Sequence, residues 1–132
     1  MVRIYLDSAP LIYLVENIAP YASTLATRLS ASDTTQVCSE LSRLECRVKP
    51  IRDREAALLT AFDSYFSGII SEVLPLTRPV LDLATELRAR YGFKTPDAIH
   101  LAAAINGGCD LFLTNDYHLE QCAEIAVEVV AP

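Results

Sequence analysis

The sequence predicts an α/β fold, a three-layer sandwich in which helices cover both faces of a central sheet of five mostly parallel strands. Short apolar runs typical of strands alternate with longer amphipathic stretches typical of helices along the whole chain. Strands that alternate with helices pair in parallel, because each helix returns the chain to the starting edge of the sheet. Residues 1–132 contain no repeat or linker and are expected to form a single domain.

Two strands and two helices are expected before residue 40. Residues 2–6 alternate in apolar character, which is typical of a strand with one buried face. Asp7 or Ser8 then caps a helix that has Pro10 in its first turn, where a proline has no intrahelical hydrogen bond to lose. The next predicted elements are a helix at 20–29 and a short strand at 36–38.

Four helices and three strands are expected after this point. Ser39 is a typical N-cap for a helix over residues 40–48. Apolar side chains at spacings of three and four predict the other helices, and Gly68 and Gly92 end two of them. The remaining elements are a helix at 53–67, a strand at 69–74, a helix at 79–91, a helix at 97–105 that begins at Thr95-Pro96, and strands at 110–113 and 125–130.

The composition narrows the class of protein. Hydrophobic residues make up 52% of the chain and charged residues 21%, as in folded globular proteins. No apolar run approaches the ~20 residues of a membrane span, and the N-terminus lacks the pattern of a signal peptide, so we expect a cytoplasmic protein without membrane association. Four cysteines stand singly, which predicts reduced and mostly buried thiols rather than a zinc site (Cys38, Cys46, Cys109 and Cys122).

Two acids follow predicted strands directly. Asp7 comes after the first strand and Asp116 after the strand at 110–113. Ligands of open α/β sheets bind beyond the carboxyl ends of the strands, where the strand order reverses. Each aspartate could instead be an ordinary helix cap or turn residue, for which aspartate is common.

Glu45 is an acid on an apolar helical face. It lies about 40° around the helix from Leu41, at roughly 100° per residue. An ionised carboxylate near a buried face needs a partner, because burial of an unpaired charge is strongly unfavourable. The partner could be a metal ion or a salt bridge to Arg43 or Arg47, or the side chain could reach solvent at the edge of the apolar stripe. The buried stripe of this helix is predicted to be Leu41, Leu44 and Val48.

Asp97 is the only acid of a helix that is apolar on nearly every side. Its place in the first helical turn favours a carboxylate through the helix dipole and puts it at the edge of the sheet. A partner of the helix dipole alone is the alternative interpretation. His100, one turn later, is expected to be a packed histidine with a satisfied ring nitrogen rather than a general base.

Four acids on four separate elements point to a metal site at one sheet edge. Hard oxygen ligands suit Mg²⁺ or Mn²⁺, as one or two ions, better than zinc. Clustered carboxylates repel one another, and a divalent cation relieves that repulsion. Hydrolysis of a phosphodiester uses such a cluster, because bound metal activates water and stabilises the leaving oxygen. The predicted ligands are Asp7, Glu45, Asp97 and Asp116.

The motifs that carry these acids resemble those of the PIN-domain nucleases, and among them the VapC-type toxins of toxin–antitoxin pairs. The resemblance extends over the whole chain and is most specific at residues 95–102. The four motifs are Ile4-Tyr5-Leu6-Asp7-Ser8, the segment from Ser39 to Glu45, Thr95-Pro96-Asp97-Ala98-Ile99-His100-Leu101-Ala102, and Leu113-Thr114-Asn115-Asp116.

The resemblance implies a flavodoxin-like sheet of five parallel strands and an endoribonuclease that depends on Mg²⁺ or Mn²⁺. By this resemblance Asp7, Glu45, Asp97 and Asp116 are the catalytic, metal-binding acids, and Ser8 and Thr114 are supporting hydroxyls. It further implies an RNA substrate, a homodimer, and inhibition by a cognate antitoxin protein. A catalytically silent PIN-like module that binds RNA or protein remains the alternative.

The net charge of −6 is unusual for a protein that binds nucleic acid, which normally presents a basic face. Metal ions at the acids would offset part of it. A local group of cations flanks Glu45 and is the candidate RNA contact, with a solvated helix face and ordinary ion pairs as the alternative (Arg43, Arg47 and Lys49, continued by Arg52 and Arg54). The helices within 11–30 and 53–67 are candidates for partner contact.

Overall fold

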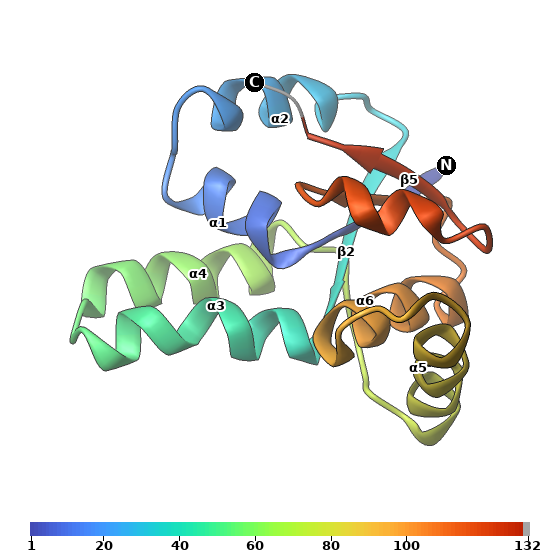
Figure 1. Cartoon of the computed structure of the whole chain (residues 1–132). Coiled ribbons are helices and arrows are strands. Elements are labelled where there is room, and N and C mark those ends of the chain that lie inside the picture. Colours follow the sequence, from blue (N-terminus) through green and yellow to red (C-terminus); the bar gives the residue numbers. More distant parts are fainter. Residues whose placement is uncertain (131–132) are drawn as a thin grey trace.

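A computed structural model describes residues 1–130, so the last two residues of the predicted domain lie outside the described part. Five strands, all parallel, form one sheet in the order β3-β2-β1-β4-β5 (Figure 1). Their bounds are β1 Val2–Leu6, β2 Thr34–Ser39, β3 Glu72–Leu74, β4 Leu111–Thr114 and β5 Ala126–Val129. The predicted fold class is therefore confirmed, with β2 longer and β3 shorter than expected.

Helices cover both faces of the sheet. On one face α1, α2 and α4 pack over Ile4 and Leu6, and on the other α5 and α6 pack over Tyr5. Neighbouring residues of β1 thus enter different cores, as the alternation of a strand requires. The helices are α1 Ser8–Val15, α2 Tyr21–Arg28, α3 Glu40–Arg52, α4 Ala56–Gly68, α5 Arg78–Tyr91 and α6 Thr95–Asn106, with a short 3₁₀ helix, η1, at Tyr117–Gln121.

Local sequence explains where the elements near the sheet edge begin and end. The Asp7 carboxylate accepts a hydrogen bond from the Ser8 backbone N–H, so Asp7 is the cap of α1. Gly92 ends α5 in the left-handed conformation, with φ of 75°. The 3₁₀ helix η1, which begins directly after Asp116, has no counterpart among the elements predicted from the sequence.

The predicted buried stripe of α3 is wrong. Leu44 and Val48 are 59% and 50% exposed, and the side chains that face the core are Ser42, Cys46 and Pro50. The start of α3 lies against the buried hydroxyl of Tyr5, and small or polar side chains fit this contact better than leucine. The apolar side instead faces outward on the hairpin that α3 forms with α4, visible at the left of Figure 1.

Two predictions from the composition can be compared with the fold. All four cysteines are free thiols, and Cys38, Cys46 and Cys122 are buried while Cys109 is half-buried. This agrees with their interpretation as reduced and mostly buried side chains. None of the helices within residues 1–130 has the length and apolar character needed to cross a membrane.

Candidate functional site

All four predicted acids lie at the edge of the sheet where the strands end. Asp7 follows β1, Asp116 follows β4, and Glu45 and Asp97 come from the first half of α3 and the first turn of α6. The central strand β1 has β2 on one side and β4 on the other, so the strand order reverses at Asp7. This is the position at which parallel sheets bind ligands.

Asp7 is 8% exposed and is held through both carboxylate oxygens. Its Oδ1 accepts from the Ser8 backbone N–H, and its Oδ2 accepts from the Thr114 hydroxyl, each at 2.8 Å. The same Thr114 oxygen accepts the backbone N–H of Asp116 at 3.1 Å. Thr114, itself fully buried, therefore links the acids that follow β1 and β4.

Glu45 is half-buried and strongly hydrogen-bonded. Its Oε1 lies 2.6 Å from the Ser8 hydroxyl, which donates to it, and 2.6 Å from Nε2 of His100. Burial raises the pKa of Glu45, but the hydrogen bonds from His100 and Ser8 outweigh it and hold this pKa below its ordinary value. The partners are thus a histidine and a serine, and the salt bridges to Arg43 or Arg47 considered above do not form.

A buried chain of polar groups stands behind Glu45. His100 is 1% exposed, and its Nδ1 lies 2.7 Å from the hydroxyl of Tyr5. The Tyr5 hydroxyl donates to Ser39 at 2.8 Å and lies 3.5 Å from the Ser42 hydroxyl. Burial raises the pKa of Tyr5 far above its usual range, so it stays neutral. His100 is the packed, hydrogen-bonded histidine that the sequence predicted.

Asp97 and Asp116 form a more open part of the cluster. Burial, together with the charges of Asp7 and Asp116, raises the pKa of Asp97. Within residues 1–130 no hydrogen bond to the Asp97 side chain is present. Asp116 accepts the backbone N–H of His118 at 2.9 Å, and its carboxylate lies 3.1 Å from the His118 ring.

The chemistry of these residues fits a hard divalent cation. Carboxylate oxygens are the ligands that Mg²⁺ and Mn²⁺ prefer, and the raised pKa of Asp97 is a sign of uncompensated negative charge. The spacing is looser than that of a finished site, because no group of three or more His, Cys, Asp or Glu side chains in residues 1–130 is placed to share one ion. Binding of an ion would require the more open acids to turn inward.

The cations proposed to contact RNA are engaged in ion pairs. Each lies on α3 and faces an acid of the protein surface, as the alternative interpretation expected. The pairs are Arg43 with Glu40 at 3.5 Å, Arg47 with Asp63 at 2.9 Å and Lys49 with Glu16 at 3.5 Å. These acids compete with phosphate for the cations, and contact with RNA stays a prediction.

Tyr5, Lys94 and His118 lie at the site but are not among the residues that the sequence predicted. Tyr5 looked like an ordinary strand residue, and no local pattern reveals that it meets His100, which is 95 positions away. Lys94 and His118 flank Asp97 and Asp116 closely in the sequence. Proximity to the two acids was the signal that could have marked them.

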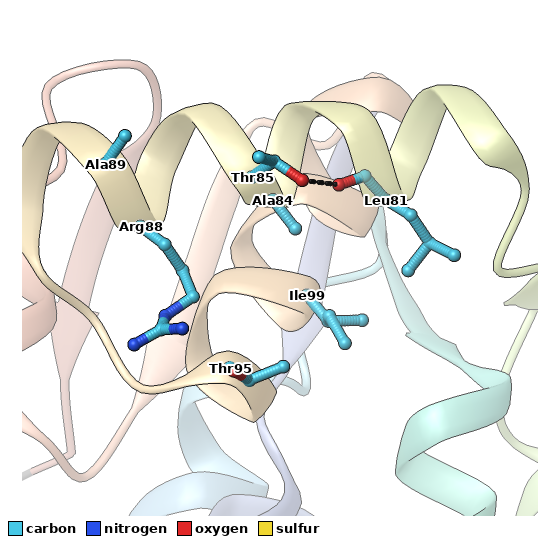
Figure 2. Close-up of a pocket in the computed structure, with 7 residues that line it drawn as sticks. All are labelled: Leu81, Ala84, Thr85, Arg88, Ala89, Thr95 and Ile99. Carbon is cyan, nitrogen blue, oxygen red and sulfur yellow. Dashed lines mark hydrogen bonds between the residues drawn. The ribbon is translucent and has the colours of Figure 1, made fainter.

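A separate groove of about 600 Å³ lies between α5 and α6, and none of the four acids lines it (Figure 2). It is lined mainly by apolar parts of both helices, including Leu81, Ala84 and Ile99. The guanidinium of Arg88 donates to the carbonyl of Phe93 at 2.7 Å, so this cation is already bound. No acid lines the groove, so it is not a candidate for the predicted metal site.

Comparison with known proteins agrees with the motifs. The family model described as PIN domain matches residues 4–125. Among curated proteins, no significant match to the sequence is found.

Several solved structures share the fold. A chain of VapBC2 from Rickettsia felis, bound to a promoter DNA fragment, has a TM-score of 0.80 and 12% identity, over 98% of this chain and all of that one. DNA-bound VapBC from Salmonella typhimurium gives 0.76 and 15%, with 98% of each chain covered. VapC20 from Mycobacterium tuberculosis, a toxin that cleaves the sarcin–ricin loop, gives 0.66 and 18%, over 83% of this chain and 86% of that one. At these identities the likeness establishes the fold.

Proposed function

We propose, from the premise that the chain belongs to the PIN domain family, that it is an endoribonuclease dependent on Mg²⁺ or Mn²⁺. One observation carries the proposal. Four acids from four elements lie beyond β1 and β4, and burial together with the charges of Asp7 and Asp116 raises the pKa of Asp97. Acids that repel one another in this way favour a divalent cation.

Two kinds of residue would take part in hydrolysis, the acids that hold the metal and the groups that orient these acids. Hydrogen bonds from Thr114, Ser8 and His100 fix the positions of the Asp7 and Glu45 carboxylates. These two acids, with Asp97 and Asp116, would hold one or two ions. When bound, the metal would supply an activated water and coordinate the phosphate oxygens. Hydrolysis would join the water oxygen to phosphorus and break the bond from phosphorus to one ribose oxygen. The attacking water would give a proton to a carboxylate, and the departing ribose oxygen would take up a proton from solvent.

Both hydrogen bonds to Glu45 reach the same oxygen, Oε1. The other oxygen has no partner among the described residues and is free to bind an ion or take up a proton from the attacking water. Ser8 and Thr114 act as supporting hydroxyls in this proposal, since each donates to a carboxylate that would otherwise be poorly solvated.

We further propose that the protein is the toxin of a toxin–antitoxin pair and forms a homodimer. The similar folds from Rickettsia felis and Salmonella typhimurium belong to VapBC complexes, and VapC20 is a toxin that cleaves the sarcin–ricin loop. The exposed apolar side of α3 supports association with a protein. The test is co-expression with the product of an adjacent small gene, followed by size-exclusion chromatography with light scattering. The mass of the complex shows whether the antitoxin binds, and the mass of the protein alone shows whether it is a homodimer.

The test of activity compares cleavage of a structured RNA in Mg²⁺ by the wild type, Asp7→Asn and Asp97→Asn. We expect both variants to lose about 100-fold or more of the rate, since each removes a charge that would hold the ion. Asp53→Asn is the matched control, because it makes the same change on an exposed acid at the far end of α3. Equal activity of all four proteins would reveal a contaminating nuclease and contradict the proposal.

One observation favours a second candidate, a module that binds RNA or protein without cutting it. No three donor side chains within residues 1–130 are placed to share an ion. A calorimetric titration with Mn²⁺ separates the two candidates. Heat and a raised melting temperature are expected of the enzyme, and their absence would favour the silent module.

A further inference from the structure

Asp97 and Asp116 lie on two separate segments that border the same cleft. Asp97 belongs to the first turn of α6, and Asp116 caps η1. Both line a cleft of about 360 Å³, and Tyr91, the last residue of α5, lines it too. Within residues 1–130 no hydrogen bond joins the two segments through the acids themselves. The separation of the acids therefore depends on the contacts that hold η1 against the end of α5.

The hydroxyl of Tyr91 makes two hydrogen bonds to the segment that follows η1. It donates to Oε1 of Glu124 at 2.6 Å and accepts the backbone N–H of Ala123 at 3.1 Å. The Glu124 carboxylate also forms an ion pair with Arg90. The hydrogen bond from Tyr91 and the charge of Arg90 hold the pKa of Glu124 below its ordinary value. One hydroxyl thus joins the end of α5 to the chain between η1 and β5.

The ring of Tyr91 is held in place as well. It stacks on the ring of Phe93, with centroids 5.0 Å apart and planes inclined by 27°. Phe93 is buried in the core that α5 and α6 share with the sheet. Gly92, between the two rings, adopts the left-handed conformation that ends α5. The residue whose hydroxyl bonds beyond η1 is therefore anchored in the turn that leads into α6 and Asp97.

The 3₁₀ helix η1 needs such an anchor, because it has few contacts of its own. It consists of five residues, and Leu119 is the only one of them that is buried. The hydrogen bonds of a short 3₁₀ helix have poor geometry and stabilise it weakly. At its start the Asp116 carboxylate accepts the backbone N–H of His118. A shift of η1 would therefore move the Asp116 carboxylate with it.

Carboxylates that bind a metal ion have to be held close to one geometry. Asp97 and Asp116 belong to the open part of the cluster, whose side chains would have to turn inward to share an ion. Rotation of the side chains brings their oxygens together only if the backbone segments that carry them keep a fixed separation. Residues that orient ligands without touching the metal commonly change its affinity by about 10- to 100-fold.

We propose that Tyr91 is a positioning residue, whose hydroxyl ties η1 to the end of α5 and so sets the separation of Asp116 from Asp97 at which both can bind one ion. Glu124 acts through Tyr91, as the acceptor that holds this hydroxyl in place. The inference rests on the metal-dependent activity proposed above, and it concerns residues that do not touch the metal.

The first test is a calorimetric titration with Mn²⁺ of the wild type and Tyr91→Phe. This variant keeps the ring and its stacking on Phe93 but removes both hydrogen bonds. We expect its affinity for Mn²⁺ to fall by about tenfold. Tyr65→Phe is the matched control, because it also removes a half-buried hydroxyl, here bonded to Gln36, and should bind Mn²⁺ like the wild type. Equal affinity of Tyr91→Phe and the wild type would overturn the proposal.

Variants of Glu124 separate the hydrogen bond from the charge. Glu124→Gln keeps an oxygen that can accept from Tyr91 and should retain most of the affinity for Mn²⁺. Glu124→Ala should lose about as much as Tyr91→Phe. Glu120→Ala is the control for charge, since it removes an exposed carboxylate of η1 itself. Equal losses in all three variants would assign the effect to negative charge near the site and contradict the role of Tyr91.

Amide hydrogen exchange of the metal-free protein reports on η1 directly. The His118 N–H is bonded to the Asp116 carboxylate, so its exchange should be faster in Tyr91→Phe but not in Tyr65→Phe. Faster exchange with unchanged Mn²⁺ affinity would mean that Tyr91 only stabilises the fold, and the inference would be wrong.

Cleavage assays separate this inference from the proposed activity. If the wild type binds Mn²⁺ and cuts RNA while Tyr91→Phe matches it in affinity and exchange, the inference is wrong and the activity stands. If Mn²⁺ affinity depends on Tyr91 as expected but the wild type cuts no RNA, the inference stands and the activity is wrong.

Discussion

The two halves of the acid cluster contain the same chemical groups in opposite surroundings. Glu45 is bonded to Ser8 and His100, and these hydrogen bonds lower its pKa in spite of burial. Asp97 is also half-buried but has no hydrogen-bonded partner within residues 1–130, and its pKa is raised by burial and by nearby acids. A carboxylate at one end is stabilised by the fold, and a carboxylate at the other end is destabilised by it.

The difference between the two halves indicates where a bound cation would stabilise the protein most. The half around Glu45 and Asp7 is already ordered by hydrogen bonds, so it would fix the position of an ion. The half around Asp97 and Asp116 carries the repulsion, so it would gain most from the positive charge. Without metal, this repulsion between carboxylates lowers the folding stability of the protein, and the same repulsion favours binding of a cation.

Loss of His100 is expected to have the largest effect on the ordered half. His100→Leu removes the donor to Glu45, and affinity for Mn²⁺ should fall by about 10- to 100-fold, as for other residues that orient metal ligands. His100→Gln carries an amide N–H that can replace Nε2 and should restore part of the affinity. Calorimetric titration with Mn²⁺ measures both. An unchanged affinity in His100→Leu would mean that the Ser8 hydroxyl suffices to orient Glu45.

Removal of a carboxylate charge should change the stability of the metal-free protein in opposite directions in the two halves of the cluster. At pH 7 Glu45→Gln is expected to lose about 1.5–3 kcal/mol of unfolding free energy, the value of hydrogen bonds to a charged group. Asp97→Asn is expected to raise the melting temperature by roughly a few degrees, because it removes a repelled charge. Thermal unfolding in EDTA measures both variants, with Asp53→Asn as the control.

The pH dependence of these differences follows from the two pKa shifts. The stability from Glu45 is present above its unfolded value of 4.5 and is lost as pH falls through its lower folded pKa. The penalty at Asp97 is present above its raised folded pKa and disappears as pH falls toward the unfolded value of 3.8. On acidification the gain of Asp97→Asn should therefore disappear by about pH 3.8, and the loss of Glu45→Gln should shrink only below about pH 4.5. A loss for Glu45→Gln that disappeared above pH 4.5, or a gain for Asp97→Asn that stayed constant below pH 3.8, would contradict the assigned surroundings.

The smallest effect on Mn²⁺ binding is expected at Tyr5, which contacts His100 and not an acid. Tyr5→Phe removes the hydroxyl that faces Nδ1 of His100 and should weaken Mn²⁺ binding a few-fold, less than His100→Leu. Tyr65→Phe is the matched control, because it removes a half-buried hydroxyl bonded to Gln36. Each variant should lose about 1 kcal/mol of unfolding free energy. If both change Mn²⁺ affinity equally, the effect of Tyr5 is one of general packing.

The fold could be predicted because alternation of strands and helices is a local pattern. The places of Asp7 and Asp116 followed from the same pattern, since the end of a strand fixes the edge of a parallel sheet. The buried side of α3 could not be predicted, because hydrophobicity favoured Leu44 and Val48 while the contact with Tyr5 requires small polar groups. Contacts such as Tyr5 with His100 depend on packing between distant segments, which periodicity does not encode.

The central place of β1 has a consequence for the timing of synthesis. Asp7 is synthesised more than a hundred residues before its neighbour strand β4 ends at Thr114, and Asp116 follows that strand. Pairing between such distant segments is a late and slow event in folding. Asp7, Asp97 and Asp116 therefore cannot come together until residue 116 has been made. Under the proposed function, a growing chain that still lacks β4 would be unable to cleave RNA, because its acid cluster would be incomplete.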